Sequence, residues 1–152
     1  MANVTLEQSL VIASVQQLIN DWAHELDINN GLKIAALVTE DCLYTVGGTL
    51  RQGRAAVELF YQERLKRLSA QPDGVPTQRH MLSNLRVDFR TGAEVSITFS
   101  LLYFTTAGMK SGLNHADPAA VADVRMDCRR DADGHWRISK FDSNQMFRRV
   151  VA

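Results

Sequence analysis

Apolar side chains in the first part of the chain recur every three or four residues, a spacing that predicts an amphipathic helix over residues 5–27. Thr5, with Gln8 three residues later, is typical of the capping box that begins a helix. A helix of this kind has one apolar face that another element must cover. Its apolar stripe contains Val11, Ile12, Val15, Leu18, Ile19, Trp22, Ala23 and Leu26.

Shorter elements follow this helix. Residues 32–38 favour a short second helix, and residues 54–68 favour a third, whose charged side chains, Arg64 among them, we expect mostly in solvent. Between these two helices, residues 42–46 indicate a short strand that ends at the glycine pair 47–48.

The second half of the chain changes to long segments in which apolar and polar residues alternate. Such alternation is typical of strands with one covered face and one wetter face. Helices first and a long antiparallel sheet afterwards predict an α+β fold. We expect a cone-shaped roll, in which a strongly curved, mostly antiparallel sheet packs on about three N-terminal helices. No linker interrupts residues 1–152, so we expect one domain. The predicted strands are 78–90, 94–107, 119–131 and 135–149.

Composition narrows the class of protein. The 17 Lys and Arg residues balance 17 Asp and Glu residues, so the chain lacks the basic surface expected of a protein that binds nucleic acid or an anionic membrane. Two cysteines, Cys42 and Cys128, are too few for a disulfide framework, and we expect reduced thiols. No signal peptide is visible, which favours a cytoplasmic protein.

The four histidines show no spacing typical of a metal site, and the chain has no phosphate-binding glycine loop or serine nucleophile motif. We therefore expect no metal and no cofactor. His24, His115 and His135 are expected at the surface, while His80 opens a long strand. A change of parity after Leu82 predicts a β-bulge, a feature often found beside active sites.

Asp27 is unusual because a carboxylate near a helix C-terminus opposes the helix dipole. It either leans into the space between helix and sheet or caps the short helix that follows. His80 is likewise either a site residue or a core histidine bonded to the backbone. Taken one at a time, these two residues leave both alternatives open.

Taken together, they carry a resemblance. Asp27 near the end of the first helix, a short second helix and the strand entrance 77–80 (Thr-Gln-Arg-His) resemble the SnoaL-like branch of the nuclear transport factor 2-like superfamily, which has a cystatin-like fold. This branch holds scytalone dehydratase and the gamma-hexachlorocyclohexane dehydrochlorinase. The segment 134–140 (Gly-His-Trp-Arg-Ile-Ser-Lys) resembles the family's last strand, and the resemblance covers roughly residues 10–145.

The resemblance implies that Asp27 and His80 form a catalytic dyad, since an aspartate and a histidine do so in those two enzymes. Other family residues do not carry over. The dehydrochlorinase's lysine and arginine fall near Trp22 and Phe141, and scytalone dehydratase's second histidine falls near Thr105. Neither enzyme's substrate specificity can therefore be transferred to this chain.

Candidate substrate-binding residues are aromatic. Tyr44 and Tyr103 carry hydroxyl groups that can polarise a carbonyl or a leaving hydroxyl, and each can equally fill the core. Trp22 and Phe141 can form an apolar wall for a ring-shaped ligand, or simply pack.

The strand around Arg125 alternates charged and apolar residues. This pattern places the charges on the outer face of the sheet, where they would suit a two-fold, sheet-to-sheet homodimer or a higher homo-oligomer. An alignment on Trp136 instead matches Arg125 with a pocket-lining asparagine of scytalone dehydratase. The sequence leaves these two interpretations open.

The main hypothesis is a cofactor-independent lyase (dehydratase-like) or isomerase. Its His80, oriented by Asp27, removes a carbon-bound proton from a small cyclic or aromatic-like substrate. The alternative is a non-catalytic module that binds a small ligand, or an accessory subunit resembling the small subunit of ring-hydroxylating dioxygenases. The distance between the two side chains discriminates these hypotheses.

Overall fold

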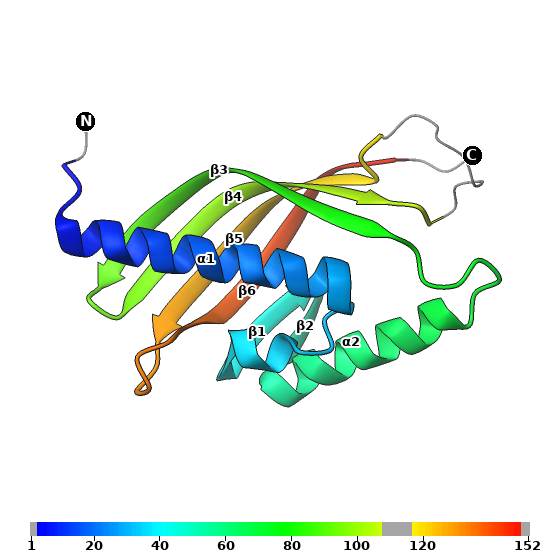
Figure 1. The fold of residues 1–152 in the computed structure, drawn as a ribbon, viewed down its shortest axis with the longest axis horizontal. Coiled ribbons are helices and arrows are strands. Elements are labelled where there is room, and N and C mark those ends of the chain that lie inside the picture. The colour runs from blue at the N-terminus through cyan, green and yellow to red at the C-terminus, as the bar shows by residue number, and fades with distance from the viewer. Residues whose placement is uncertain (1–2, 108–116, 150–152) are drawn as a thin grey trace.

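The computed structural model describes residues 3–107 and 117–149. Within these ranges, helices and strands follow one another in an order that matches the predicted α+β class (Figure 1). The elements are α1 (Leu6–Asn29), the 3-10 helix η1 (Ile34–Leu37), β1 (Val38–Val46), β2 (Thr49–Gln52), α2 (Arg54–Ser69), β3 (Gln78–Thr91), β4 (Glu94–Thr105), β5 (Ala120–Arg130) and β6 (Trp136–Arg148).

The predicted capping box begins α1. The Thr5 hydroxyl accepts the backbone N–H of Gln8 at 3.2 Å, and the Gln8 side-chain oxygen accepts the backbone N–H of Thr5 at 3.0 Å. The helix ends at Asn29 because Asn30 adopts a left-handed conformation with φ of 56°. Its apolar stripe is buried from Val15 to Leu26.

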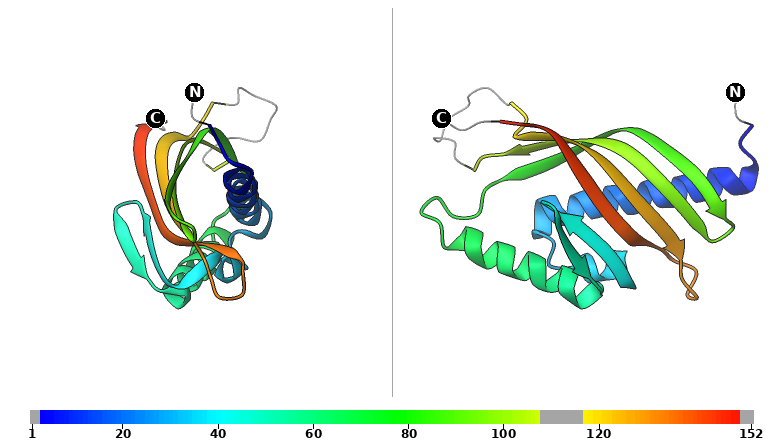
Figure 2. Two further views of the ribbon diagram at one scale, coloured as in Figure 1. Left: turned by 90° about the vertical axis from the view of Figure 1, so that its left-hand side faces the viewer. Right: turned by 180° about the vertical axis from the view of Figure 1, so that it is seen from behind.

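Six strands form one curved sheet in the order β2-β1-β6-β5-β4-β3, in which only the β1–β6 pair is parallel. The four long strands that alternation predicted are all present. The end-on view shows the sheet curving around α1, with α2 beneath the short strands (Figure 2). This arrangement confirms the cone-shaped α+β roll.

The chain differs from the prediction between the first and third expected helices. The segment 32–38 contains only the four-residue turn η1, and Val38 already begins β1, earlier than the strand predicted over 42–46. The glycine pair 47–48 joins β1 to β2, which the sequence did not predict. The short strand β2 was missed because it is mostly exposed and has no apolar alternation.

The predicted bulge lies in β3. Asn84 is left-handed with φ of 58°, and the pairing of β3 with β4 shifts between Ser83 and Arg86. Because of this extra residue, His80 and Leu82 lie on the covered face before the bulge, and Leu85 after it packs against the same core. The bulge therefore keeps both halves of one strand facing the interior.

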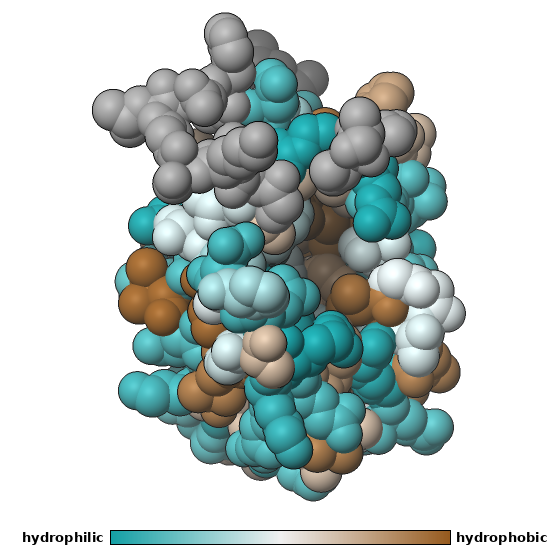
Figure 3. All heavy atoms as spheres, turned by 90° about the vertical axis from the view of Figure 1, so that its right-hand side faces the viewer, coloured by the Kyte–Doolittle hydropathy of each residue, from teal (hydrophilic) through white to brown (hydrophobic). Residues whose placement is uncertain are grey.

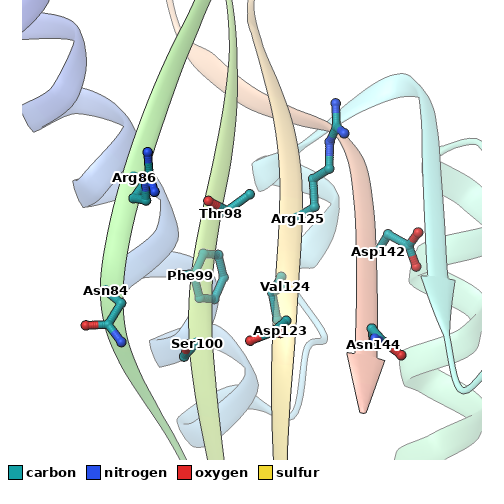
Figure 4. Close-up of a pocket in the computed structure, with 10 residues that line it drawn as sticks. All are labelled: Asn84, Arg86, Thr98, Phe99, Ser100, Asp123, Val124, Arg125, Asp142 and Asn144. Atoms are coloured by element: carbon teal, nitrogen blue, oxygen red, sulfur yellow. The ribbon is translucent and has the colours of Figure 1, made fainter. Parts of the chain in front are cut away.

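The outer face of the sheet carries the charges. Val124, Met126 and Cys128 of β5 are buried against the helices, whereas the Arg125 side chain is 52% exposed. Arg125 instead borders a depression of about 480 Å³ on the outer face, lined by residues of β3 to β6 that are mostly polar (Figure 4). The alternation is thus the better of the two interpretations of this strand.

Surface and core residues follow the remaining expectations where the structure describes them. His24 and His135 are exposed, and His115 lies outside the described residues. Cys42 and Cys128 are buried free thiols, and burial raises the pKa of each to about 12. Among residues 3–107 and 117–149, no helix is long and apolar enough to cross a membrane.

Candidate active site

A cavity of about 780 Å³ opens at the wide end of the roll, between the sheet, α2 and the end of α1. Figure 3 shows this end of the molecule, where hydrophobic atoms lie at the bottom of a hollow. The volume falls in the range of small-molecule sites. Much of its lining is apolar and comes from Leu26, Val46, Phe60, Leu101, Ala120 and Ala122.

His80 lines this cavity and is held from behind by Asp27. The His80 Nδ1 atom lies 2.6 Å from one carboxylate oxygen of Asp27, and the other oxygen accepts the backbone N–H of His80 at 3.0 Å. The His80 side chain is 12% exposed and that of Asp27 is 9% exposed. Both oxygens of one carboxylate therefore fix one histidine at the strand entrance.

Two aromatic rings set the plane of the imidazole. The Trp22 ring meets the His80 ring edge-on with centroids 5.7 Å apart, and the Tyr103 ring lies 4.9 Å from it on another side. A carboxylate bound at Nδ1 makes that nitrogen the donor, so Nε2 carries the lone pair. An imidazole held in this way can accept a proton at Nε2.

The other candidate aromatic residues form a packed wall behind the cavity rather than its lining. Trp22 Nε1 donates a 2.9 Å hydrogen bond to the Tyr44 hydroxyl, and Tyr44 stacks on Phe141 with ring centroids 4.4 Å apart. All three side chains are at most 3% exposed. Of the four aromatic candidates, only Tyr103 borders the cavity.

Gln78 is a polar group of the site that the sequence analysis quoted without assigning a role. Its side chain is 2% exposed, and its amide donates to the Leu26 carbonyl at 2.5 Å. Its oxygen accepts from Arg64 at 2.8 Å and from the Tyr103 hydroxyl at 3.0 Å. Strand parity was the available signal, because Gln78 lies two residues before His80 on the same face.

Tyr61 and Arg64 of α2 also line the cavity. Arg64, expected in solvent, is half-buried, and the hydroxyl of Tyr61 lies 2.7 Å from that of Tyr44. Burial raises the pKa of Tyr61 to about 12 and raises that of Tyr44 well above its ordinary value. Both hydroxyls are thus neutral at pH 7.

Gly31 fixes the position of Tyr61. It has a φ of +82°, a backbone conformation that residues with a side chain rarely adopt. A Cβ atom at this position would also lie 2.4 Å from the Tyr61 ring. Only glycine satisfies both conditions. The end of α1 can therefore lie directly on the ring that faces the cavity.

Glu25, and not Asp27, holds the turn that follows α1. One of its carboxylate oxygens accepts the backbone N–H of Lys33 at 2.6 Å, and the other accepts the Asn29 amide at 2.7 Å. The 3-10 helix has no side-chain cap. The alternative in which Asp27 caps the next helix is therefore wrong, and its carboxylate is committed to His80.

In the part of the chain that the structure describes, no three His, Cys, Asp or Glu side chains come together in an arrangement that could hold a metal ion.

Several proteins of known structure share the fold of this chain. Its fold matches that of a protein from Catenulispora acidiphila solved in complex with S-DNPA (24% identity, 91% of this chain and 95% of that chain, TM-score 0.73). It also matches a type 2 hexachlorocyclohexane dehydrochlorinase (17% identity, 97% and 93%, TM-score 0.74). A third match is ActVI-ORFA from Streptomyces coelicolor (15% identity, 90% and 98%, TM-score 0.73).

No curated protein sequence matches the chain significantly. The model of the SnoaL-like domain matches residues 7–142, which include both helices, Asp27, His80 and nearly all of the sheet except the end of β6. The match thus spans most of the chain, as the resemblance in its sequence implied. The chain belongs to the SnoaL-like family.

Proposed function

We propose that the protein is a cofactor-independent lyase or isomerase in which His80 removes a carbon-bound proton from a small cyclic or aromatic-like substrate. The observation that carries this proposal is the 2.6 Å contact between His80 Nδ1 and Asp27 at the wall of a cavity of ligand size. The fold neighbour described as a dehydrochlorinase supports it, because elimination of that kind also begins at a C–H bond.

The proposed step begins with the transfer of one proton from carbon to His80. His80 Nε2 takes the proton from carbon, and the electron pair of the broken C–H bond forms a new double bond. In a lyase, a leaving group on the adjacent carbon departs with its bonding pair. In an isomerase, the pair shifts along the conjugated system and the His80 imidazolium returns the proton to the carbon at its other end. The Asp27 carboxylate stabilises the imidazolium that forms, as the aspartate does in hydrolase triads.

The aromatic residues have indirect roles in this proposal. Tyr103 borders the substrate, while Trp22, Tyr44 and Phe141 form the packed wall behind the cavity, and Trp22 also sets the plane of the imidazole. The apolar part of the cavity lining keeps water from the reacting carbon, which strengthens electrostatic interactions within the site.

A panel of hydroxylated cyclic ketones tests the proposal. In D₂O, NMR should show exchange of the acidic C–H of an accepted ketone and, for a lyase, loss of water. His80→Gln should lower the rate by ~10²–10⁴-fold, the usual contribution of general-base catalysis. Asp27→Asn should lower it as well, because an amide cannot stabilise the imidazolium.

The matched control is His24→Gln, which removes an exposed histidine from the same domain and should leave the rate unchanged. Circular dichroism should show the same fold in all variants. A rate that survives His80→Gln contradicts the proposed mechanism. Ketones that bind without any exchange favour the alternative, a ligand-binding module.

We also propose that the protein forms a homodimer through the outer face of the sheet. Side chains of opposite sign alternate there along β5, from Asp123 through Arg125 to Asp127, an arrangement that can be complementary to itself about a two-fold axis. Light scattering should give twice the chain mass for the wild type. Arg125→Glu should shift the population to monomer, and a monomeric wild type contradicts the proposal.

A further inference from the structure

The cavity-lining residues of α2 combine a hydroxyl with a cation. Tyr61 and Arg64 are three residues apart, a spacing that places them on one face of the helix, and both line the cavity. Arg148 of β6 lines it as well. No Asp or Glu belongs to the lining among the described residues, since Asp27 lies behind His80. The cavity therefore has positive groups without a matching carboxylate.

The direction of the hydrogen bonds behind Tyr61 follows from what each group can do. Trp22 Nε1 is only a donor, so the Tyr44 oxygen accepts there. Tyr44 is 0% exposed, so its hydroxyl proton needs an acceptor within the protein. Among the described residues, that acceptor is the hydroxyl oxygen of Tyr61, which lies 2.7 Å away. The favourable direction is thus Trp22 to Tyr44 to Tyr61, because the opposite one leaves a buried donor unsatisfied.

This direction leaves the proton of Tyr61, a residue that lines the cavity, for an acceptor other than Tyr44. A hydroxyl that already accepts one hydrogen bond becomes a better donor, because chains of hydrogen bonds polarise one another. The pKa of Tyr61 is raised to about 12 by burial, so it presents O–H rather than a negative charge. Tyr61 is therefore the end of a donor chain that begins in the core.

Arg64 is oriented by a neutral partner. Its Nη2 atom donates to the Gln78 oxygen at 2.8 Å, and Gln78 is itself held by the Leu26 carbonyl. Within residues 3–107 and 117–149, no carboxylate forms an ion pair with its guanidinium, which has five N–H donors in all. The guanidinium thus has a fixed orientation, and no carboxylate among the described residues neutralises its charge.

We propose that Tyr61 and Arg64 bind a negatively charged oxygen of the ligand. The substrate class is then an enolisable ketone, whose oxygen gains charge as His80 removes the carbon-bound proton. A phenolate carries the same charge on oxygen without any reaction. The inference rests on the proposed function for the reaction, but the binding of an oxyanion can be measured without any turnover. It assigns the electrophilic half of the site to α2, opposite the base on β3.

The probe is 4-nitrophenol, which absorbs visible light only as the phenolate, and 4-nitroanisole is its neutral counterpart. The wild type should bind the phenolate about 10-fold more tightly than the anisole, so bound 4-nitrophenol should ionise at lower pH than the free compound. Arg64→Gln should weaken phenolate binding about 10-fold, and Tyr61→Phe about 5-fold. Neither substitution should change the affinity for 4-nitroanisole.

Two further variants make the result specific. Arg67→Gln removes an exposed cation from the same helix and should leave phenolate binding unchanged. His80→Gln should keep the preference for phenolate, so a failure of the proposed catalysis and a failure of the oxyanion site give different results. Circular dichroism verifies that each variant is folded.

Four outcomes overturn the inference. The first is an equal effect of the Arg64 and Arg67 substitutions on phenolate binding, and the second is ionisation of bound 4-nitrophenol at the same or higher pH than the free compound. The third is a phenolate preference that is lost in His80→Gln but kept in Arg64→Gln. The fourth is that 4-nitrophenol does not bind at any pH. The third outcome would assign the anion to the imidazolium instead.

Discussion

The space between α1 and the sheet has two ends. The strands pair in the same way at both ends, but the side chains that point inward differ in size. At the closed end, Ile97 of β4 pairs with Met126 of β5, and both are 0% exposed. Toward the open end, the partner of Leu101 is Ala122 and that of Tyr103 is Ala120. The β4 residues stay large while the β5 residues shrink, and the cavity begins where they have shrunk.

This difference shows that side-chain size, as well as sheet curvature, makes the cavity. Along the inner face of β5 the side chain shrinks from Met126 through Val124 to Ala122 and Ala120. Protein interiors are otherwise packed as densely as organic crystals, so a run of alanines on an inner face leaves space unless another element fills it. The closed end should therefore account for stability, and the open end for ligand binding.

Of the substitutions that test this difference between the two ends, Met126→Ala should have the largest effect on stability. Truncation of a fully buried side chain at the closed end is expected to lower the free energy of unfolding by ~2–5 kcal/mol, from lost transfer energy and the cavity left behind. Urea unfolding measures it. Met81→Ala is the control, because that methionine is 57% exposed and its truncation should change stability by about 0.5 kcal/mol or less. Similar values for both would mean that the closed end is loosely packed.

Ala122→Leu should separate binding from stability. The larger side chain enters the open end, so the affinity for 4-nitrophenolate should fall at least about 10-fold, while unfolding free energy changes by less than about 1 kcal/mol. Ala55→Leu adds the same side chain to an exposed position of α2 and should leave affinity unchanged. A loss of 1–3 kcal/mol in stability would indicate that this end is already filled.

The smallest effect concerns the ion pair outside the closed end. Arg129 contacts Asp41 at 2.9 Å, and its hydrogen bonds lower the pKa of that carboxyl to about 2. Because the pair is exposed and screened by solvent, Asp41→Asn should cost less than ~1 kcal/mol at pH 7.

The sign of its pH dependence follows from the lowered pKa. A carboxyl that ionises more readily in the folded state adds stability above its unfolded pKa, and this contribution disappears as pH falls through about 2. The difference in unfolding free energy between wild type and Asp41→Asn, measured by urea unfolding, should therefore shrink as the pH is lowered from 4 to 2. A constant difference would assign the effect to something other than this pair. Asp73→Asn, in an exposed loop, is the control.

The sequence predicted those parts of the fold whose signal is local. The capping box at Thr5, the four long strands and the bulge near Asn84 all follow from neighbouring residues. The segment 32–38 was misassigned because a short apolar run does not by itself distinguish a helical turn from the start of a buried strand. Where the strand begins in this segment depends on the pairing of Val38 with Ile138 of β6, which is distant in the sequence.

The candidate site was predictable only in part, for the same reason. Asp27 and His80 stood out because each was unusual in its own element, and a resemblance joined them. Tyr61 and Arg64 did not stand out, since α2 exposes an apolar residue, Leu59, and buries part of a charged one. Gln78 gains its importance only from partners on α1, α2 and β4.

The bulge at Asn84 has a consequence for how such a chain tolerates change in length. Side chains of a strand alternate between faces, so a one-residue deletion at this position would reverse the orientation of one half relative to the other. Every amino acid of the site would still be encoded, yet either the imidazole or the apolar side chains after the bulge would face away from the interior. A substitution can therefore change one side chain of the site at a time, whereas a single lost codon here would disturb the site or the core at once.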